Sequence, residues 1–171
     1  MTLRTILLGA ALATSGSIAL AESHMPSAAT AEVQGKDGIS GRVTLNITPS
    51  DRILVLIDVT GVPAGTHGVH LHETGDCSAE DYKSAGGHIA GGQQHGVMVE
   101  GGPHPGDLPN MVVGEDGILR AEVFLDELDV DQMIKDDDGA AFIIHAGADD
   151  YKSQPAGNAG DRIACGVLTP S

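Results

Sequence analysis

Apolar and polar residues alternate along most of the chain in short runs that are typical of β-strands. Between residues 41 and 47, Val43, Leu45 and Ile47 occupy one face of a period-two pattern. Similar short runs recur between glycine-rich turns, at 31–33, 53–59, 69–72, 111–113, 117–124, 140–145 and 162–168. Only 125–134 has a pattern compatible with a brief helical turn. The pattern therefore predicts an all-β sandwich or barrel of about eight strands.

Turns and long connections punctuate this pattern. Residues 36–38 and 114–116 are hairpin-turn signals between neighbouring strands. Two much longer connections, 73–110 and 146–161, are rich in glycine and polar residues. Connections of that length are uncommon in compact domains and are usually functional. We therefore expect a β scaffold that carries a site on two elaborated loops.

The first 21 residues have the three parts of a secretory signal peptide. Arg4 supplies the positive start, 5–20 is a run of apolar and small residues, and 19–21 reads Ala-Leu-Ala. A retained membrane anchor is the alternative, but 14–17 interrupts the run, which falls short of the roughly 20 apolar residues of a membrane span. The sequence predicts cleavage after Ala21 and one domain over 22–171, with no membrane segment in the mature form.

The composition is acidic, with 24 Asp and Glu against 9 Lys and Arg and a formal net charge of −15. This charge disfavours nucleic acid and anionic membranes as partners. The chain has two cysteines, Cys77 and Cys165, and both lie in the exported part. An even pair in an oxidising compartment predicts a disulfide bond.

Seven of the eight histidines lie between residues 65 and 146, and only His24 lies outside this segment. His70 and His72 form a His-x-His pair on a predicted strand, so both imidazoles point to one face and can reach one metal ion. His145 ends another apolar strand. Together these three rings suit copper or zinc. Incidental histidines in a structural β-sandwich are the alternative for each of them taken alone.

A second set of candidate ligands follows in the first long connection. It contains three imidazoles and one carboxylate, a combination suited to tetrahedral zinc. Its members are His88, His95, His104 and Asp107. Ligand type alone does not name the metal at either set.

Several motifs resemble those of one enzyme family. Residues 68–73, Gly-Val-His-Leu-His-Glu, are similar to a motif of the copper,zinc superoxide dismutases, and 157–167 are similar to the C-terminal signature of that family. Three further family-like segments, 84–88, 102–108 and 145–150, fall between them in the expected order. The resemblance covers essentially all of 31–170.

This resemblance implies an eight-stranded Greek-key β-barrel and an oxidoreductase that converts two superoxide anions to oxygen and hydrogen peroxide. Copper would cycle between two oxidation states, with a structural zinc beside it, one of each per chain. The family's ligands correspond here to His70, His72, His88 and His145 for copper and to His88, His95, His104 and Asp107 for zinc. His88 would bridge both metals and supply a proton.

The resemblance also assigns supporting roles. Asp149 would join His70 to His95, as hydrogen-bonded carboxylates often support metal-bound histidines. Arg162 would lie beside copper and attract the anionic substrate. The disulfide would hold the first long loop to the last strand, and His67 would be structural. Lys83 and Lys152 lie in the two long loops, where both an auxiliary role and plain solvation are open.

One departure concerns the zinc ligands: six residues separate His88 from His95, where the family typically has seven or more. This shortening favours slightly a rival function, a metal-binding protein of the same fold that buffers or delivers copper or zinc. Arg162 favours the enzyme, because a storage site gains nothing from an anion-attracting cation.

The short second loop resembles bacterial members and, with the signal peptide, predicts a periplasmic protein. The family includes monomers and dimers, so both a monomer and a homodimer stay open.

Overall fold

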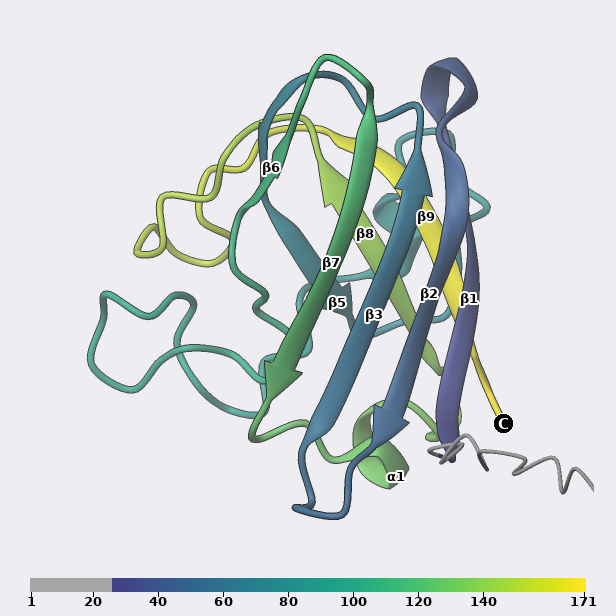
Figure 1. Ribbon diagram of the computed structural model, residues 1–171. Helices are drawn as coiled ribbons and strands as arrows, with labels where there is room; N and C mark the ends of the chain where they lie inside the picture. The colour runs from purple at the N-terminus through teal and green to yellow at the C-terminus, as the bar shows by residue number, and fades with distance from the viewer. Residues whose placement is uncertain (1–25) are drawn as a thin grey trace, which may run out of the picture.

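The computed structural model describes residues 26–171, so the predicted signal peptide and His24 lie outside the described residues. Seven strands form one antiparallel sheet in the order β5-β8-β9-β1-β2-β3-β7. Their bounds are β1 Ser27–Gly35, β2 Ser40–Ile47, β3 Ile53–Thr60, β5 Val69–His72, β7 Ile118–Leu125, β8 Ala140–His145 and β9 Arg162–Pro170. The sheet curls, so that β7, β3, β2 and β1 form one layer and β5, β8 and β9 lie behind it (Figure 1).

A short two-stranded ribbon closes the curled sheet. Strand β4 (Gly65–His67) pairs with β6 (Met111–Val113). Gly68 separates β4 from β5, and the turn from Gly114 to Gly117 joins β6 to β7. Since β5 and β7 are the two edges of the sheet, the ribbon links one edge to the other. This arrangement confirms the predicted β-barrel. Strand β5 coincides with the strand predicted at 69–72, whereas the short strand β4 was not predicted.

The barrel interior is filled by aliphatic side chains and one aromatic ring. Val43, Leu45 and Phe142 are fully buried, as the alternation along β2 predicts for the first two. The prediction was wrong for Ile47, which is 39% exposed. Ile47 is the last residue of β2, opposite the irregular start of β1, where the register shifts between Ser27 and Ala29. The buried face therefore ends before Ile47.

The strand ends differ from the sequence pattern at both chain termini. β1 begins at Ser27, before the run predicted at 31–33, and β9 continues to Pro170, beyond the run predicted at 162–168. The cause is long-range pairing, because Ala29 lies opposite Pro170 and Thr30 opposite Thr169. The predicted turn at 36–38 is a 3-10 helix, η1 (Lys36–Gly38), and the predicted helical turn is α1 (Val130–Met133).

The two long connections carry little regular structure, apart from the 3-10 helix η2 (Lys83–Ala85) in the first. Cys77 in the first connection and Cys165 on β9 form the predicted disulfide bond. Much of both connections projects from the same side of the barrel, on the left in Figure 1. Among residues 26–171, no helix is long and apolar enough to cross a membrane.

Candidate metal centre

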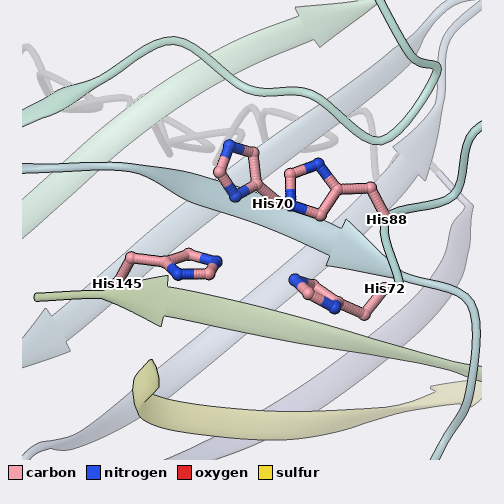
Figure 2. Close-up of side chains that lie close together, drawn as sticks. All are labelled: His70, His72, His88 and His145. Atoms are coloured by element: carbon pink, nitrogen blue, oxygen red, sulfur yellow. The ribbon is translucent and has the colours of Figure 1, made fainter. Parts of the chain in front are cut away.

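Four buried histidines lie close together along β5 (Figure 2). His70 and His72 belong to β5, His145 ends the neighbouring strand β8, and His88 comes from the first long connection. One ring nitrogen of each lies within 4.8 Å of the others. We call these residues the four-histidine group. Period-two alternation on β5 and the antiparallel pairing of β5 with β8 place three of the rings together.

In each ring of this group, one nitrogen contacts a fixed oxygen atom of the protein. The pairs are His70 Nε2 with Asp149 Oδ2 at 2.6 Å, His72 Nδ1 with Gly86 O at 3.1 Å, His88 Nδ1 with Asp107 Oδ1 at 2.9 Å and His145 Nδ1 with Gly160 O at 3.2 Å. Carbonyl and carboxylate oxygens only accept hydrogen bonds, so in metal-free His70, His72 and His145 these nitrogens carry the proton. The other nitrogen of each neutral ring then offers a lone pair.

Those remaining nitrogens are buried and have no hydrogen-bond partner within the described part of the chain. They are His70 Nδ1, His72 Nε2, His88 Nε2 and His145 Nε2. Buried polar atoms are nearly always satisfied, because an unpaired one costs free energy. These four nitrogens face one another, so a single metal ion bound between them would give each of them a partner.

Burial keeps three of these rings neutral. It lowers the pKa of His72 to about 2 and the pKa of His145 to about 3, with the positive charge of Arg162 adding to the effect. Burial also lowers the pKa of His70 to about 4, although the hydrogen bond to Asp149 opposes the shift. Neutral imidazole is the form that binds metals, so these ligands are ready at neutral pH.

A second group forms around Asp107. Its Oδ1 atom lies 2.9 Å from Nδ1 of His88, 3.1 Å from Nδ1 of His95 and 3.3 Å from Nδ1 of His104. We call these four residues the aspartate group. His70 is also within reach, but its Nε2 contacts Asp149 and its unpaired Nδ1 belongs to the four-histidine group. The buried Nδ1 of His104 also has no hydrogen-bond partner in residues 26–171, and it is not part of that group. His104 is therefore the better fourth ligand.

The Asp107 carboxylate is held in its charged form. Burial alone would raise its pKa, but the hydrogen bond with His88, the backbone N–H groups of Gly96 and His104 and the electrostatic interaction with His95 together hold the pKa well below its usual value. A charged carboxylate with three imidazoles is a donor set suited to zinc.

The short segment between His88 and His95 still brings both rings to Asp107. Gly91 and Gly92 adopt left-handed backbone conformations, with φ of 57° and 80°, and Gln93 N–H donates to Ala90 O. Glycine adopts this conformation without steric cost. The two glycines thus form a tight turn that six residues can span.

Asp149 joins the two groups through its carboxylate. Oδ2 lies 2.6 Å from His70 Nε2, and Oδ1 lies 3.0 Å from His95 Nε2. Burial raises the pKa of Asp149, but hydrogen bonds from His70, Tyr151 N–H and His95 outweigh it and lower the pKa overall. Gly157 is tightly constrained here, because a Cβ at this position would overlap Asp149 Oδ1 and His95 Nε2.

A cleft of about 420 Å³ reaches the four-histidine group at His145. Arg162 lines it, and its guanidinium donates to Tyr82 O and Gly86 O, both at 2.6 Å. Gly86 O also accepts from His72 Nδ1, so one carbonyl joins the arginine to a histidine of the group. Lys36, Asp81, Lys83 and Asp161 also line the cleft, and Lys152 is not among its lining residues.

Two residues of the site have no signal in the sequence. Lys36 lies in the turn after β1, and it reaches the cleft because Gly35 pairs with Ala164 on β9. Gln154 contacts the backbone of His95 from the second long connection. His67 lies outside both ligand groups, with its ring nitrogens 2.8 Å from the carbonyl oxygens of Pro63 and His145.

Comparisons with known proteins agree with this geometry. The family model described as copper/zinc superoxide dismutase matches residues 39–168. A copper-zinc superoxide dismutase from Caulobacter vibrioides is 38% identical over 148 residues, which cover 82% of this chain and 84% of that protein. One from Neisseria meningitidis is 34% identical and covers 98% of this chain and 100% of its own length.

A solved structure of a SOD-like protein from Bacillus subtilis superimposes with a TM-score of 0.75 at 32% identity. The match covers 84% of this chain and 100% of the other. Fold and site thus define a β-barrel protein with two adjoining metal-ligand groups that share one histidine. The chain belongs to the copper/zinc superoxide dismutase family. This membership confirms the family resemblance, the oxidoreductase class and the two metals expected from the sequence.

Proposed function

We propose that the protein dismutes superoxide at a paired copper and zinc centre. The observation that carries this proposal is the set of four unpartnered, buried nitrogens in the four-histidine group. The opposite nitrogen of each ring contacts an oxygen that only accepts hydrogen bonds, so the lone pairs are directed at one common space.

The two donor sets suit different metals. The four-histidine group would hold copper, since imidazole suits a metal that cycles between oxidation states. The aspartate group would hold zinc, with His88 shared through its two nitrogens. Bound copper supplies one-electron chemistry, by which two superoxide anions and two protons give one oxygen molecule and one hydrogen peroxide molecule.

Arg162 attracts and orients the substrate in this proposal. Its hydrogen bonds to two backbone carbonyls fix the guanidinium at the wall of the cleft. An arginine has five N–H donors, so others stay available for an anion. Burial lowers the pKa of Arg162, but an arginine remains cationic in proteins.

His88 is the residue to which we assign proton delivery. Its Nε2 atom belongs to the four-histidine group and its Nδ1 atom faces Asp107. When Nε2 carries a proton, that proton lies among the other three histidines and is available to the reduced product. Asp149 orients His70 and His95 and takes no direct part in the chemistry.

The cellular setting is part of the same proposal. Residues 1–21 read as a signal peptide cleaved after Ala21, and 22–171 as one domain. The Cys77–Cys165 disulfide and the similarity to bacterial relatives support a periplasmic location.

The decisive experiment measures metal content and superoxide turnover on one purified sample of the mature protein. We expect about one copper and one zinc per chain, with fast dismutation that cyanide abolishes. Full metal loading without turnover would contradict the enzyme and favour a metal carrier. Copper binding without zinc would contradict our assignment of the aspartate group.

A further inference from the structure

The side chain of Gln154 makes two hydrogen bonds to the backbone of His95. His95 N–H donates to Gln154 Oε1 at 2.9 Å, and Gln154 Nε2 donates to His95 O at 2.9 Å. The two residues are 59 positions apart. Nε2 also donates to Lys152 O at 3.1 Å, so the amide uses both donors and one acceptor. This pattern fixes the orientation of the amide group.

The main chain of His95 depends on this contact, because its own segment provides few hydrogen bonds to hold it. Within residues 26–171, the hydrogen bonds of the His95 backbone N–H and C=O are those with Gln154. The neighbouring anchors are Gln94 N–H to Gly101 O and Gly96 N–H to Asp107 Oδ2. The short turn from His88 therefore ends at a residue whose main chain is held from another loop.

The second long connection approaches this segment closely at a further point. Met98 N–H donates to Tyr151 O, and a Cβ on Gly96 would overlap the same carbonyl. Gln154 itself lines the substrate cleft. One loop thus forms the cleft wall and contacts the backbone around His95, in addition to the Asp149 contact with the His95 ring.

We propose that Gln154 is a positioning residue for His95 and thereby sets the affinity of the aspartate group for zinc. The amide holds the main chain of His95 while Asp149 holds its ring, so the two contacts fix the position and the direction of Nδ1. The short segment after His88 then reaches the site with support from outside its own loop. This inference rests on the proposed function, because it requires zinc at the aspartate group.

The rival explanation is that Gln154 only fills space in the loop. Gln154 is an exposed residue, so packing contributes little to its role. Replacement by methionine separates the two explanations, since it keeps the length of the side chain and removes every hydrogen bond. Gln154→Ala removes both the length and the hydrogen bonds.

Asn158→Gly provides a matched control. Asn158 lies in the same loop and lines the same cleft, but within the described residues its side chain donates only to Asp150 and Ser153. Its φ of 53° suits glycine, so this change removes the side-chain hydrogen bonds and keeps the backbone conformation.

The test is a zinc-affinity measurement on the full mature chain by competition with a chromophoric chelator, together with the visible spectrum of cobalt(II) bound at the same site. We expect Gln154→Met and Gln154→Ala to weaken zinc binding about 10-fold, the lower end of the effect of residues that support metal ligands. The cobalt spectrum should change in both variants. Asn158→Gly should stay within about twofold of the wild type, as for an ordinary surface substitution.

Wild-type zinc affinity in Gln154→Met would overturn the inference, and so would an equal loss in Asn158→Gly. A wild-type protein that binds zinc but does not dismute superoxide would contradict the proposed function and leave this test intact. A wild-type protein that binds no zinc would overturn both. If Gln154→Ala fails to fold, Gln154→Met, which keeps the side-chain length, decides the question.

Discussion

The two ligand groups share His88 but are built in different ways. The four-histidine group takes three members from strands β5 and β8, whose register is fixed by a ladder of backbone hydrogen bonds. The aspartate group comes entirely from one loop, and side chains of a second loop, Asp149 and Gln154, hold its member His95. Strands position ligands through many cooperative bonds, and loops through a few specific ones. We therefore expect the aspartate group to be the more sensitive to single substitutions.

Acid should have the largest effect of all. It should lower the stability of the metal-free protein, and it should act through the four-histidine group. The pKa values of His70, His72 and His145 fall from 6.5 to about 4, 2 and 3 in the fold. Below pH 6.5 the unfolded chain therefore takes up protons that the folded chain does not. Stability is fully present above this pH and is lost as the pH falls towards 4, by on the order of a few kcal/mol. Urea unfolding across this range measures the loss.

His72→Gln is the companion variant for the acid experiment, since it removes one of the three titrating rings and should make the dependence on pH shallower. Asp107 and Asp149 contribute only at the acid end of this window, because their pKa values are lowered from 3.8 and an unfolded aspartate takes up protons only below about pH 5. A stability that stays constant between pH 6.5 and 4 would refute the assignment of neutral, buried rings.

Asp149→Asn should sharpen the difference between the groups. In the wild type, each of the two ring nitrogens faces a carboxylate oxygen, which accepts a hydrogen bond. Asparagine replaces one of these oxygens with an N–H donor, so the contact with one of the two rings becomes repulsive. We expect zinc affinity to fall by about 10- to 100-fold. Copper affinity should fall less, because β5 still positions His70. Separate titrations with the two metals check this.

Asp150→Asn is the control for that change, since in the part of the chain that the structure describes the Asp150 side chain accepts hydrogen bonds only from its own loop. Equal losses of copper and zinc in Asp149→Asn would show that strand and loop ligands depend on the carboxylate alike.

Arg162→Ala should reduce turnover about 10-fold at low salt, the lower end of the range for electrostatic attraction of a charged substrate, of which superoxide dismutases are a known example. Copper content should not change, because the four histidines keep their own contacts. Stopped-flow turnover and metal analysis on the same sample test this. Loss of copper would instead make Arg162 a structural support of His72 through Gly86.

Lys36→Gln should have the smallest effect, a decrease of about twofold in turnover at low salt that disappears as salt screens the cleft. Lys36 lies in the cleft lining, whereas Lys152 does not. Lys152→Gln changes the net charge equally and should leave turnover unaltered. If both variants slow the enzyme to the same extent, the overall charge of the protein is responsible and not the local field.

Sequence reasoning was strongest where chemistry follows local periodicity. The alternation around His70 and His72 predicts that both rings share a face, and the apolar runs locate β3, β8 and β9. The prediction failed where pairing between distant strands determines the bounds of a strand or the position of a side chain. The start of β1 at Ser27, the exposure of Ile47 and the approach of Lys36 to the cleft all depend on strands distant in sequence. The contact of Gln154 could not be predicted, because nothing in a Gln-Pro dipeptide indicates a hydrogen bond to a backbone 59 residues away.

The pairing of β1 with β9 has a consequence for how the protein matures. The first and last described strands are neighbours, so the barrel cannot be completed until the whole chain is available. Barrels with such distant contacts fold slowly, over milliseconds to seconds. Arg162 and Cys165 both lie on β9, and they take their places only with that strand. The disulfide bond to the first long loop, and the attraction of substrate that we assign to Arg162, therefore cannot be in place before β9 has joined the barrel.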